Sequence, residues 1–173
     1  GSILKMLNMS GDKDILSNLM ELNIFPVAIS YEFDPCDFLK AKEFQQKRDD
    51  PDFVKSQRDD LLSMETGILN NKGRVHFTLT SPINDQLAKL DPNMEKNELI
   101  AAKEIYKHYR FYPCNYVAYD LLTGTRRFSE HYGLKDKKQF EDYLQGQLDK
   151  IVLPNKDEAF LRTKILEMYT NPL

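Results

Sequence analysis

The sequence predicts an α/β fragment followed by a mostly α-helical C-terminal region. Residues 24–29 (IFPVAI) form an apolar run rich in strand-forming residues, as expected of a buried strand. Residues 73–80 alternate between apolar and polar side chains, the pattern of a strand with two different faces. From residue 97 onward, apolar residues recur at helical spacing instead. Because two strands alone make no stable sheet, we expect either weak strands that the pattern hides or further strands outside this sequence.

Length and composition limit the class of protein. The chain has 173 residues, 41% of them hydrophobic, which is enough for a buried core and too many for a disordered chain. Its net charge of −3 makes nucleic acid a poor partner. No run approaches the ~18 apolar residues of a membrane span, and no signal peptide is visible. Cys36 and Cys114 form neither a CxxC pair nor a metal spacing, which favours a reduced, cytoplasmic setting.

The chain divides into stretches of different character. Gly1-Ser2 is typical of the remnant of a cleaved tag, so we expect native sequence upstream. Residues 3–88 carry the α/β pattern, and residues 89–96 are polar and form a connector. Residues 97–173 form the helical extension.

Start signals locate the elements of the first half. Pro26 cannot donate to a sheet, so it should lie near the start of the strand within residues 23–31 or at a bulge. Asp34-Pro35 predicts a helix start, and Ser56 is the expected cap of a second helix. The inner stripe of the first of these helices is expected at Phe38, Leu39 and Phe44. The second is expected to carry Leu61, Leu62, Met64 and Ile68.

Similar signals divide the second half into helices. Asn97 is the expected cap of a helix that Pro113 ends, and Pro113 in turn starts the next helix. Asp136 is the expected cap of a helix through Ile151. Asp157 and Glu158 favour the first turn of a last helix, ending near Tyr169. Gly124 and Gly133 are expected turn residues.

Motifs for phosphate loops, zinc proteases and serine hydrolases are absent from the sequence. The available bases are His76, His108 and His131, and the first two are expected at an outer strand face and among packed aromatic residues. His131 and Asp136 fit the pattern H-x-x-x-x-D, in which an aspartate orients a histidine that deprotonates an acceptor hydroxyl. Asp136 is already needed as a helix cap, and the following residues form an ordinary amphipathic helix. We therefore expect this pair to be a decoy and assign no catalytic residue.

Two ordered blocks resemble the family of bacterial 1-acylglycerol-3-phosphate acyltransferases. Residues 24–29 resemble the family's Pro-Val strand, and residues 73–83 resemble the strand ending in Pro-Ile that closes the family's core. The run 31–42 (YEFDPCDFLKAK) resembles a lineage with a longer insertion between those strands. The resemblance covers about the first half of the chain. The family's H-x-x-x-x-D and Glu-Gly-x-Arg blocks precede the Pro-Val strand, and the 25 residues before Pro26 contain neither.

This resemblance implies a parent that transfers a fatty acyl group from a coenzyme A or carrier-protein thioester to a lysophospholipid-type hydroxyl. It implies part of an α/β sandwich working at the inner face of a membrane, and a fragment that is itself inactive. The sequence suggests no metal or organic cofactor. In the family the Pro-Val block lies on the acyl-donor side, so Pro26, Val27 and Ile29 are candidates for lining an acyl or pantetheine channel. A plain core strand explains them equally well.

Two other functions remain open from the sequence. The helical residues 97–173 could form a noncatalytic protein-interaction module, with the α/β part as scaffold. Alternatively, the chain could be a self-contained acyltransferase with its chemistry at His131 and Asp136. The oligomeric state, the acyl chain and the acceptor are not determined by the sequence.

Overall fold

The computed structural model describes residues 15–89 and 103–173. They form a mixed α/β chain that is mostly helical and holds one two-stranded antiparallel sheet. The chain folds as two compact units that are interleaved in sequence. In the described residues, the first unit comprises 15–30, 75–89 and 103–110, and the second comprises 31–74 and 111–173. Each unit therefore draws on both the 3–88 and the 97–173 stretches.

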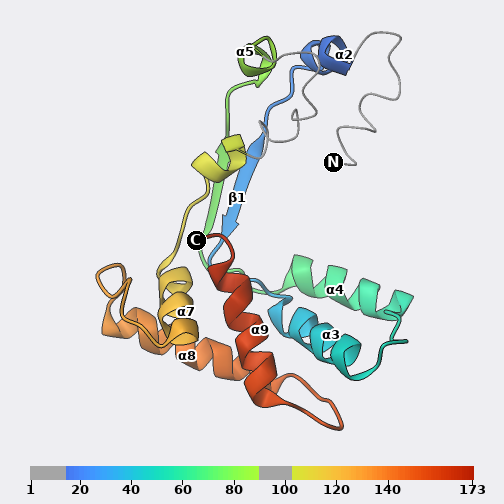
Figure 1. Cartoon of the computed structure of the whole chain (residues 1–173), viewed down its shortest axis with the longest axis vertical. Coiled ribbons are helices and arrows are strands. Elements are labelled where there is room, and N and C mark those ends of the chain that lie inside the picture. The colour runs from blue at the N-terminus through green and yellow to red at the C-terminus, as the bar shows by residue number, and fades with distance from the viewer. Residues whose placement is uncertain (1–14, 90–102) are drawn as a thin grey trace. The chain divides into compact units, whose positions relative to one another are not determined.

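The first unit holds the sheet and short helices (Figure 1). Its elements are α2 (Ile15–Glu21), β1 (Val27–Tyr31, whose last residue belongs to the second unit), β2 (Val75–Leu79) and α5 (Asn84–Leu87), with residues 103–107 also helical. A small core joins α2 to α5 through Leu19, Ile83 and Leu87. The Asn84 side-chain amide donates to the Met20 carbonyl at 2.9 Å, which ties the two helices together.

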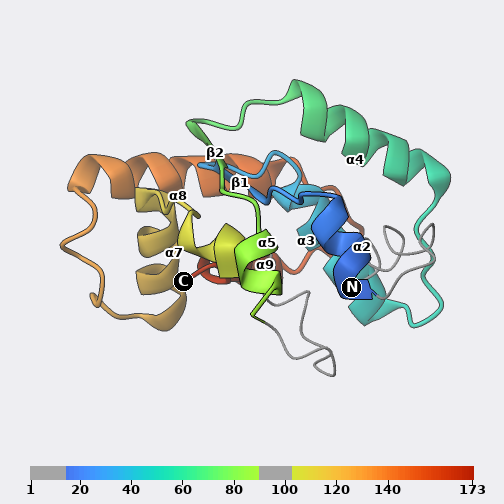
Figure 2. The same cartoon turned by 90° about the horizontal axis from the view of Figure 1, so that it is seen from above.

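The second unit is a helical bundle. Its helices are α3 (Asp37–Asp49), α4 (Gln57–Leu69), α7 (Pro113–Thr123), α8 (Leu134–Asp149) and α9 (Glu158–Thr170). In both views α9 runs between α7 and α3, the two helices against which it packs most closely (Figures 1 and 2). The core is formed mainly by apolar residues of α7, α8 and α9, among them Val117, Phe140, Leu144, Leu148, Leu161 and Ile165.

Local signals set several helix ends, as the sequence predicts. The start expected at Asp34-Pro35 is wrong, because the Asp34 carboxylate closes a turn through the Cys36 N–H and α3 begins only at Asp37. The Ser56 hydroxyl accepts a hydrogen bond from the Asp59 backbone N–H at 3.2 Å, and α4 begins at the next residue. Pro113 is the first residue of α7, and Gly124 ends it with a φ of +66°. Asp157 caps α9 by accepting from the Phe160 N–H at 3.0 Å. The expected cap at Asn97 lies outside the described residues.

The sheet is an antiparallel ribbon with a defined register. Thr80 N donates to Pro26 O at 3.1 Å at one end, and Glu32 N donates to Arg74 O at 2.9 Å at the other. This register sets Ile29 opposite Phe77. Pro26 directly precedes β1, so the prediction that it lies near the strand's start is confirmed.

The prediction of a buried strand is only half right, because burial and hydrophobicity fall on opposite faces of the ribbon. On one face Ala28 and Ser30 are buried, and the Ser30 hydroxyl accepts a hydrogen bond from Arg110 N at 2.9 Å. On the other face Ile29 is exposed, as are Phe77 and Leu79 at 64% and 62%. The small side chains of Ala28 and Ser30 leave room for the backbone near Arg110 to approach, whereas the bulky face is left uncovered.

Two helical stripes also differ from expectation. Phe44 is largely exposed, and α3 instead buries Asp37, Ala41 and Gln45. Gln45 is held inside because its amide donates to the Asn155 carbonyl at 2.6 Å. The apolar residues expected on the inner stripe of α4 are exposed, with Ile68 at 71%.

An ion pair between the buried Glu32 and the largely exposed Arg74 lies where the chain enters the second unit. The Arg74 guanidinium donates to both oxygens of Glu32, at 3.0 and 2.8 Å, and the Arg74 N–H adds a bond of 2.9 Å. Burial tends to raise the pKa of Glu32, but the hydrogen bonds and charge of Arg74 prevail and hold it below its usual value. The Cys114 thiol donates to the Glu32 carbonyl at 3.0 Å and so connects this pair to α7.

None of the described helices combines the length and the hydropathy needed to cross a bilayer.

Candidate functional site

The structure places His131 and Asp136 in separate structural roles. The His131 ring stacks on Tyr116, with ring centroids 4.4 Å apart. The Asp136 carboxylate accepts a hydrogen bond from the Gly133 N–H at 2.8 Å, at the start of α8. Asp136 therefore satisfies a backbone donor at the helix N-terminus, although it lies in the first turn rather than at the cap position itself.

The other two histidines also make local contacts. The His76 ring lies 2.7 Å from the Thr78 hydroxyl on the same strand. The His108 ring lies 2.8 Å from the Glu104 carbonyl, one helical turn earlier. The His76 contact does pair an imidazole with a hydroxyl, but neither contact joins a histidine to a carboxylate that would orient it as a general base.

The three candidate channel residues divide between the two faces of the ribbon. Pro26 is buried, and its carbonyl accepts from both the N–H and the hydroxyl of Thr80. Ile29 is exposed and Val27 is half-buried, and both project from the uncovered apolar face. Only Val27 and Ile29 are therefore positioned to contact a ligand through their side chains.

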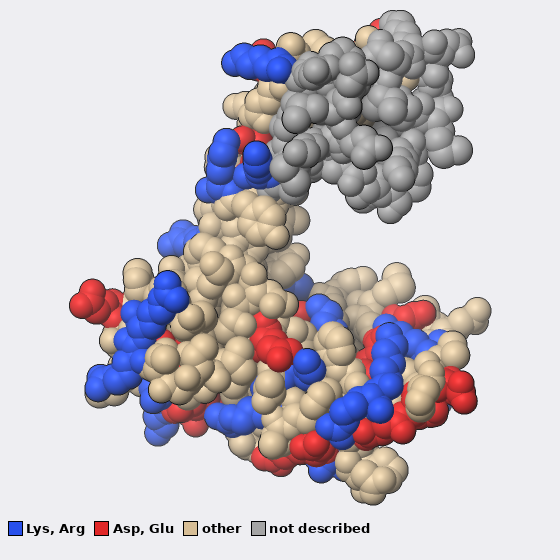
Figure 3. Space-filling model, in the orientation of Figure 1, with Lys and Arg blue, Asp and Glu red and all other residues tan. Residues whose placement is uncertain are grey.

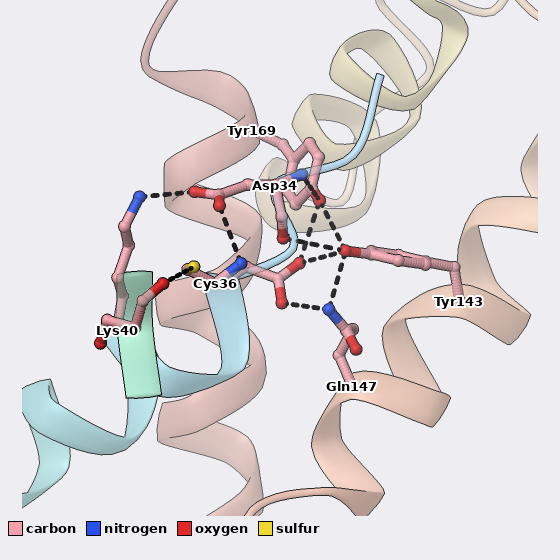
Figure 4. Close-up of polar contacts among 8 residues, drawn as sticks. Asp34, Cys36, Lys40, Tyr143, Gln147 and Tyr169 are labelled. Atoms are coloured by element: carbon pink, nitrogen blue, oxygen red, sulfur yellow. Dashed lines mark hydrogen bonds and ion pairs between the residues drawn. The ribbon is translucent and has the colours of Figure 1, made fainter. Parts of the chain in front are cut away.

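The most concentrated polar site of the second unit surrounds Asp37, at the start of α3. Figure 4 shows Tyr143, Gln147 and Tyr169 converging there from α8 and α9. One Asp37 oxygen accepts from the hydroxyls of Tyr143 and Tyr169, at 2.7 and 2.9 Å, and the other accepts from the Gln147 amide at 2.5 Å.

Asp34 extends this site toward the surface. Its backbone N–H donates to the Tyr169 hydroxyl at 3.0 Å, and its carboxylate accepts from the Cys36 N–H at 2.9 Å. The same carboxylate pairs with Lys40 at 2.5 Å (Figure 4). Local turn geometry thus fixes the start of α3, and the tyrosines attach it to α8 and α9.

Asp37 is wholly buried, and its hydrogen-bond partners in the described chain are all uncharged. Burial raises the pKa of Asp37 to about 6, although the hydrogen bonds from Tyr143 and Tyr169 act in the opposite direction. A carboxyl group with such a pKa could in principle transfer protons near neutrality. Asp37 has no exposed surface, and its hydrogen bonds join α3 to α8 and α9.

A pocket of about 410 Å³ lies beside the loop that connects α7 to α8. The buried carboxylate of Asp120 organises it by accepting from the Phe128 N–H at 3.1 Å and from the Tyr132 hydroxyl at 2.9 Å. Arg126 and Lys137 contribute positive charge to its wall, and Ser129 contributes a hydroxyl. The turns predicted at Gly124 and Gly133 indicate the loop, but no sequence pattern indicates this pocket.

Neither cysteine is set up as a nucleophile. Burial raises the pKa of the Cys114 thiol to about 12, and burial followed by the charge of Asp34 raises the pKa of Cys36. Within residues 15–89 and 103–173, no three His, Cys, Asp or Glu side chains gather into a group that could hold a metal ion.

The Asp37 site was missed from the sequence because its members are far apart along the chain. Tyr143 and Tyr169 follow Asp37 by 106 and 132 residues. The only local signal was the four-residue spacing of Tyr143 and Gln147, which places both on one face of α8. That signal cannot identify the acid that the two residues contact.

Comparison of the chain with protein-family models, with curated proteins and with solved structures gives no match.

Proposed function

We propose that this chain is the C-terminal part of a glycerolipid-type acyltransferase, and that it supports the reaction without carrying the catalytic histidine and aspartate. The parent would move a fatty acyl group from a coenzyme A or carrier-protein thioester to the hydroxyl of a lysophospholipid. The ribbon β1–β2 would then be one part of the parent's α/β sandwich.

The uncovered apolar face of the ribbon carries this proposal. Ile29, Phe77 and Leu79 expose their side chains on one side of a two-stranded sheet. Such a face is expected where a sheet continues into, or is covered by, a further layer. The two blocks that resemble the acyltransferases fall on the two strands that pair to make this face, with α3 and α4 as the insertion between them.

The turn before β2 supports the assignment of the second block. Gly73 has a φ of +64°, and a Cβ atom there would lie 2.7 Å from a carboxylate oxygen of Glu32 and 2.8 Å from the Phe33 ring. Only glycine fits this position without a shift of its neighbours. The backbone conformation and the close neighbours therefore explain why a glycine precedes β2 in this chain.

The proposal gives the candidate residues distinct roles. Val27 and Ile29 would contact the acyl chain or pantetheine arm, whereas Pro26 would position them through its carbonyl bonds to Thr80. His131 and Asp136 would have no catalytic part.

A thioester-release assay tests the proposal. This chain and the product of its complete reading frame are each incubated with acyl-coenzyme A and lysophosphatidate. We expect thiol release only from the complete product, whose upstream sequence should contain H-x-x-x-x-D and Glu-Gly-x-Arg. A reading frame without those blocks refutes the proposal, and so does release by this chain that disappears in His131→Ala.

The complete product also allows a test of the ribbon face. Ile29→Asp should raise the KM for the acyl donor at least tenfold, because it buries a charge where an apolar chain would bind. Val152→Asp, beyond the end of α8, introduces a similar change at another exposed apolar position and serves as the control. Equal effects of the two substitutions would remove Ile29 from the donor site.

The alternative function, a protein-interaction module, is expected from the sequence in residues 97–173, but the exposed apolar stripe lies on α4, outside that region. Helices α7, α8 and α9 bury their apolar stripes within the second unit, but α4 exposes Leu61, Met64 and Ile68 on one side. Such a stripe suits a partner helix. If α4 is the docking element, Leu61→Ser with Ile68→Ser should abolish any self-association or partner binding measured by sedimentation. An unchanged sedimentation profile would exclude this role for α4.

A further inference from the structure

A cationic surface surrounds the start of α8. Residues 126–138 contain five basic and two acidic residues, a net charge of +3 within a chain whose total is −3. In Figure 3, Lys and Arg side chains gather over the α7–α8 loop and the start of α8, at the left of the view, with fewer acidic side chains among them. We call this surface, formed by residues 126–138, the α8 patch.

The basic residues of the α8 patch are not neutralised by ion pairs. Elsewhere in the second unit, Lys40, Lys47, Arg48 and Arg74 each lie against a carboxylate. Among the described residues, by contrast, no carboxylate forms an ion pair with any of the five basic residues of the patch, which are Arg126, Arg127, Lys135, Lys137 and Lys138.

The acidic groups nearby are largely engaged with the backbone or hydroxyls. Asp136 accepts from the Gly133 N–H, and the buried Asp120 accepts from Phe128 N and the Tyr132 hydroxyl. Glu130 is exposed, and Glu141 and Asp142 follow the patch on α8; with these two included, residues 126–142 hold five basic and four acidic residues and still carry a net charge of +1. The surface therefore keeps a net positive charge that is available to an anionic partner.

An exposed apolar side chain lies within this positive surface. Leu134, the first residue of α8, is 89% exposed and is flanked in sequence by Lys135. It borders the pocket that Arg126 and Lys137 line, and it also borders a shallow depression lined by Lys135 and Lys138. An exposed leucine beside lysines that form no ion pair within the described chain is favourable for binding a partner with anionic groups at its surface and an apolar layer beneath them.

We propose that the α8 patch binds the surface of a bilayer that contains anionic phospholipids. Leu134 would enter the acyl boundary, Lys135 and Lys138 would contact lipid phosphates, and the pocket of about 410 Å³ would accept one head-group phosphate between Arg126 and Lys137. Charge complementarity favours this partner, because each basic residue near an anionic membrane contributes about 1 kcal/mol to binding. The single apolar tip favours a bilayer over nucleic acid, whose phosphate surface offers it no apolar environment. This contact does not depend on the acyl-transfer reaction.

Vesicle flotation tests the electrostatic part. The chain should float with vesicles of phosphatidylglycerol and phosphatidylcholine, and it should not float with phosphatidylcholine alone or at high salt. Lys135→Gln with Lys138→Gln should weaken binding about 30-fold, which corresponds to the two charges at about 1 kcal/mol each. The control is Lys47→Gln with Arg58→Gln, which changes the net charge equally at exposed positions on α3 and α4 and should bind within about threefold of the wild type.

A second pair of variants tests the apolar tip. Leu134→Ser should weaken binding about tenfold, because the side chain no longer enters an apolar region. Val152→Ser, at a position 81% exposed beyond the other end of α8, should leave binding unchanged. All these residues are exposed, so circular dichroism should show the same fold in each variant.

Four results would overturn the proposal. The first is equal binding to neutral vesicles, and the second is no binding to either kind of vesicle. The third is an equal loss of binding in the two charge-matched pairs. The fourth is saturable binding of soluble glycerol 3-phosphate without vesicle binding, which would make the pocket a site for free phosphate esters instead. None of these measurements requires turnover, so their outcome is separate from that of the acyl-transfer test.

Discussion

Replacing Asp37 by asparagine removes the ionisable group that α3, α8 and α9 share, while it keeps the size of the side chain. In the folded protein burial raises the pKa of Asp37 from its usual 3.8 to about 6. The folded state therefore binds this proton more tightly than the unfolded chain does. Stability contributed by the proton is fully present below about pH 4 and is lost as the pH rises toward 6.

The size of the effect follows from the shift. A shift of about two pKa units corresponds to about 3 kcal/mol in the free energy of unfolding. The free energy of unfolding of the wild type minus that of Asp37→Asn should thus fall by at most about 3 kcal/mol between roughly pH 4 and pH 7. Taking the difference cancels the contributions of all other titrating groups that the substitution leaves unchanged.

Urea unfolding at a series of pH values measures this difference. Circular dichroism reports the helices, and tyrosine emission is usable because the chain has no tryptophan. Asp142→Asn, at an exposed position next to Tyr143, is the matched control and should keep the wild-type pH dependence. A difference that stays flat over this range, or that rises with pH, would show that burial does not dominate the environment of Asp37.

Three further substitutions should change the free energy of urea unfolding in stated ways. Gly73→Ala should destabilise the chain by roughly 1–2 kcal/mol because alanine disfavours the left-handed backbone, and the clash of its Cβ with Glu32 should add to this loss. A neutral result would mean that the turn rearranges freely. Ser56→Ala should cost about 1 kcal/mol because the Asp59 N–H loses its acceptor, and Ser56→Thr should restore most of that stability. Leu144→Ala, at a wholly buried position, should cost about 2–5 kcal/mol, and a loss below about 1 kcal/mol would contradict the packing of α8 described above.

The helix ends could be predicted because the groups that set them are adjacent in sequence. The Ser56 hydroxyl reaches a donor three residues away, Pro113 fixes its own backbone angle, and Asp157 reaches Phe160. The two strands could be predicted for a similar reason, since alternation and strand-forming residues act over a few neighbouring positions. Asp136 serves the start of α8, although from the first turn rather than from the expected cap position.

The faces of those elements could not be predicted in the same way. The pattern at residues 75–79 states that Phe77 and His76 point in opposite directions, but not which side meets another layer. The approach of Arg110 to Ser30 covers the side with small residues and leaves the bulky side uncovered. On the covered side, the Ser30 hydroxyl accepts from the Arg110 N–H, and the small side chains of Ala28 and Ser30 let that backbone segment come close. On the other side, the bulky side chains of Ile29 and Phe77 would prevent such an approach.

By itself the sequence determined the starts of α4, α7 and α9 and the approximate positions of the two strands, because capping, proline geometry and residue periodicity act over a single turn or strand. Only the tertiary structure decided which polar groups meet, since Asp37 finds its donors on two helices more than a hundred residues away. It also decided that the five basic residues of the α8 patch have no ion-pair partner among the described residues, because the buried Asp120 and Asp136 at the helix start accept from backbone N–H groups or a hydroxyl instead.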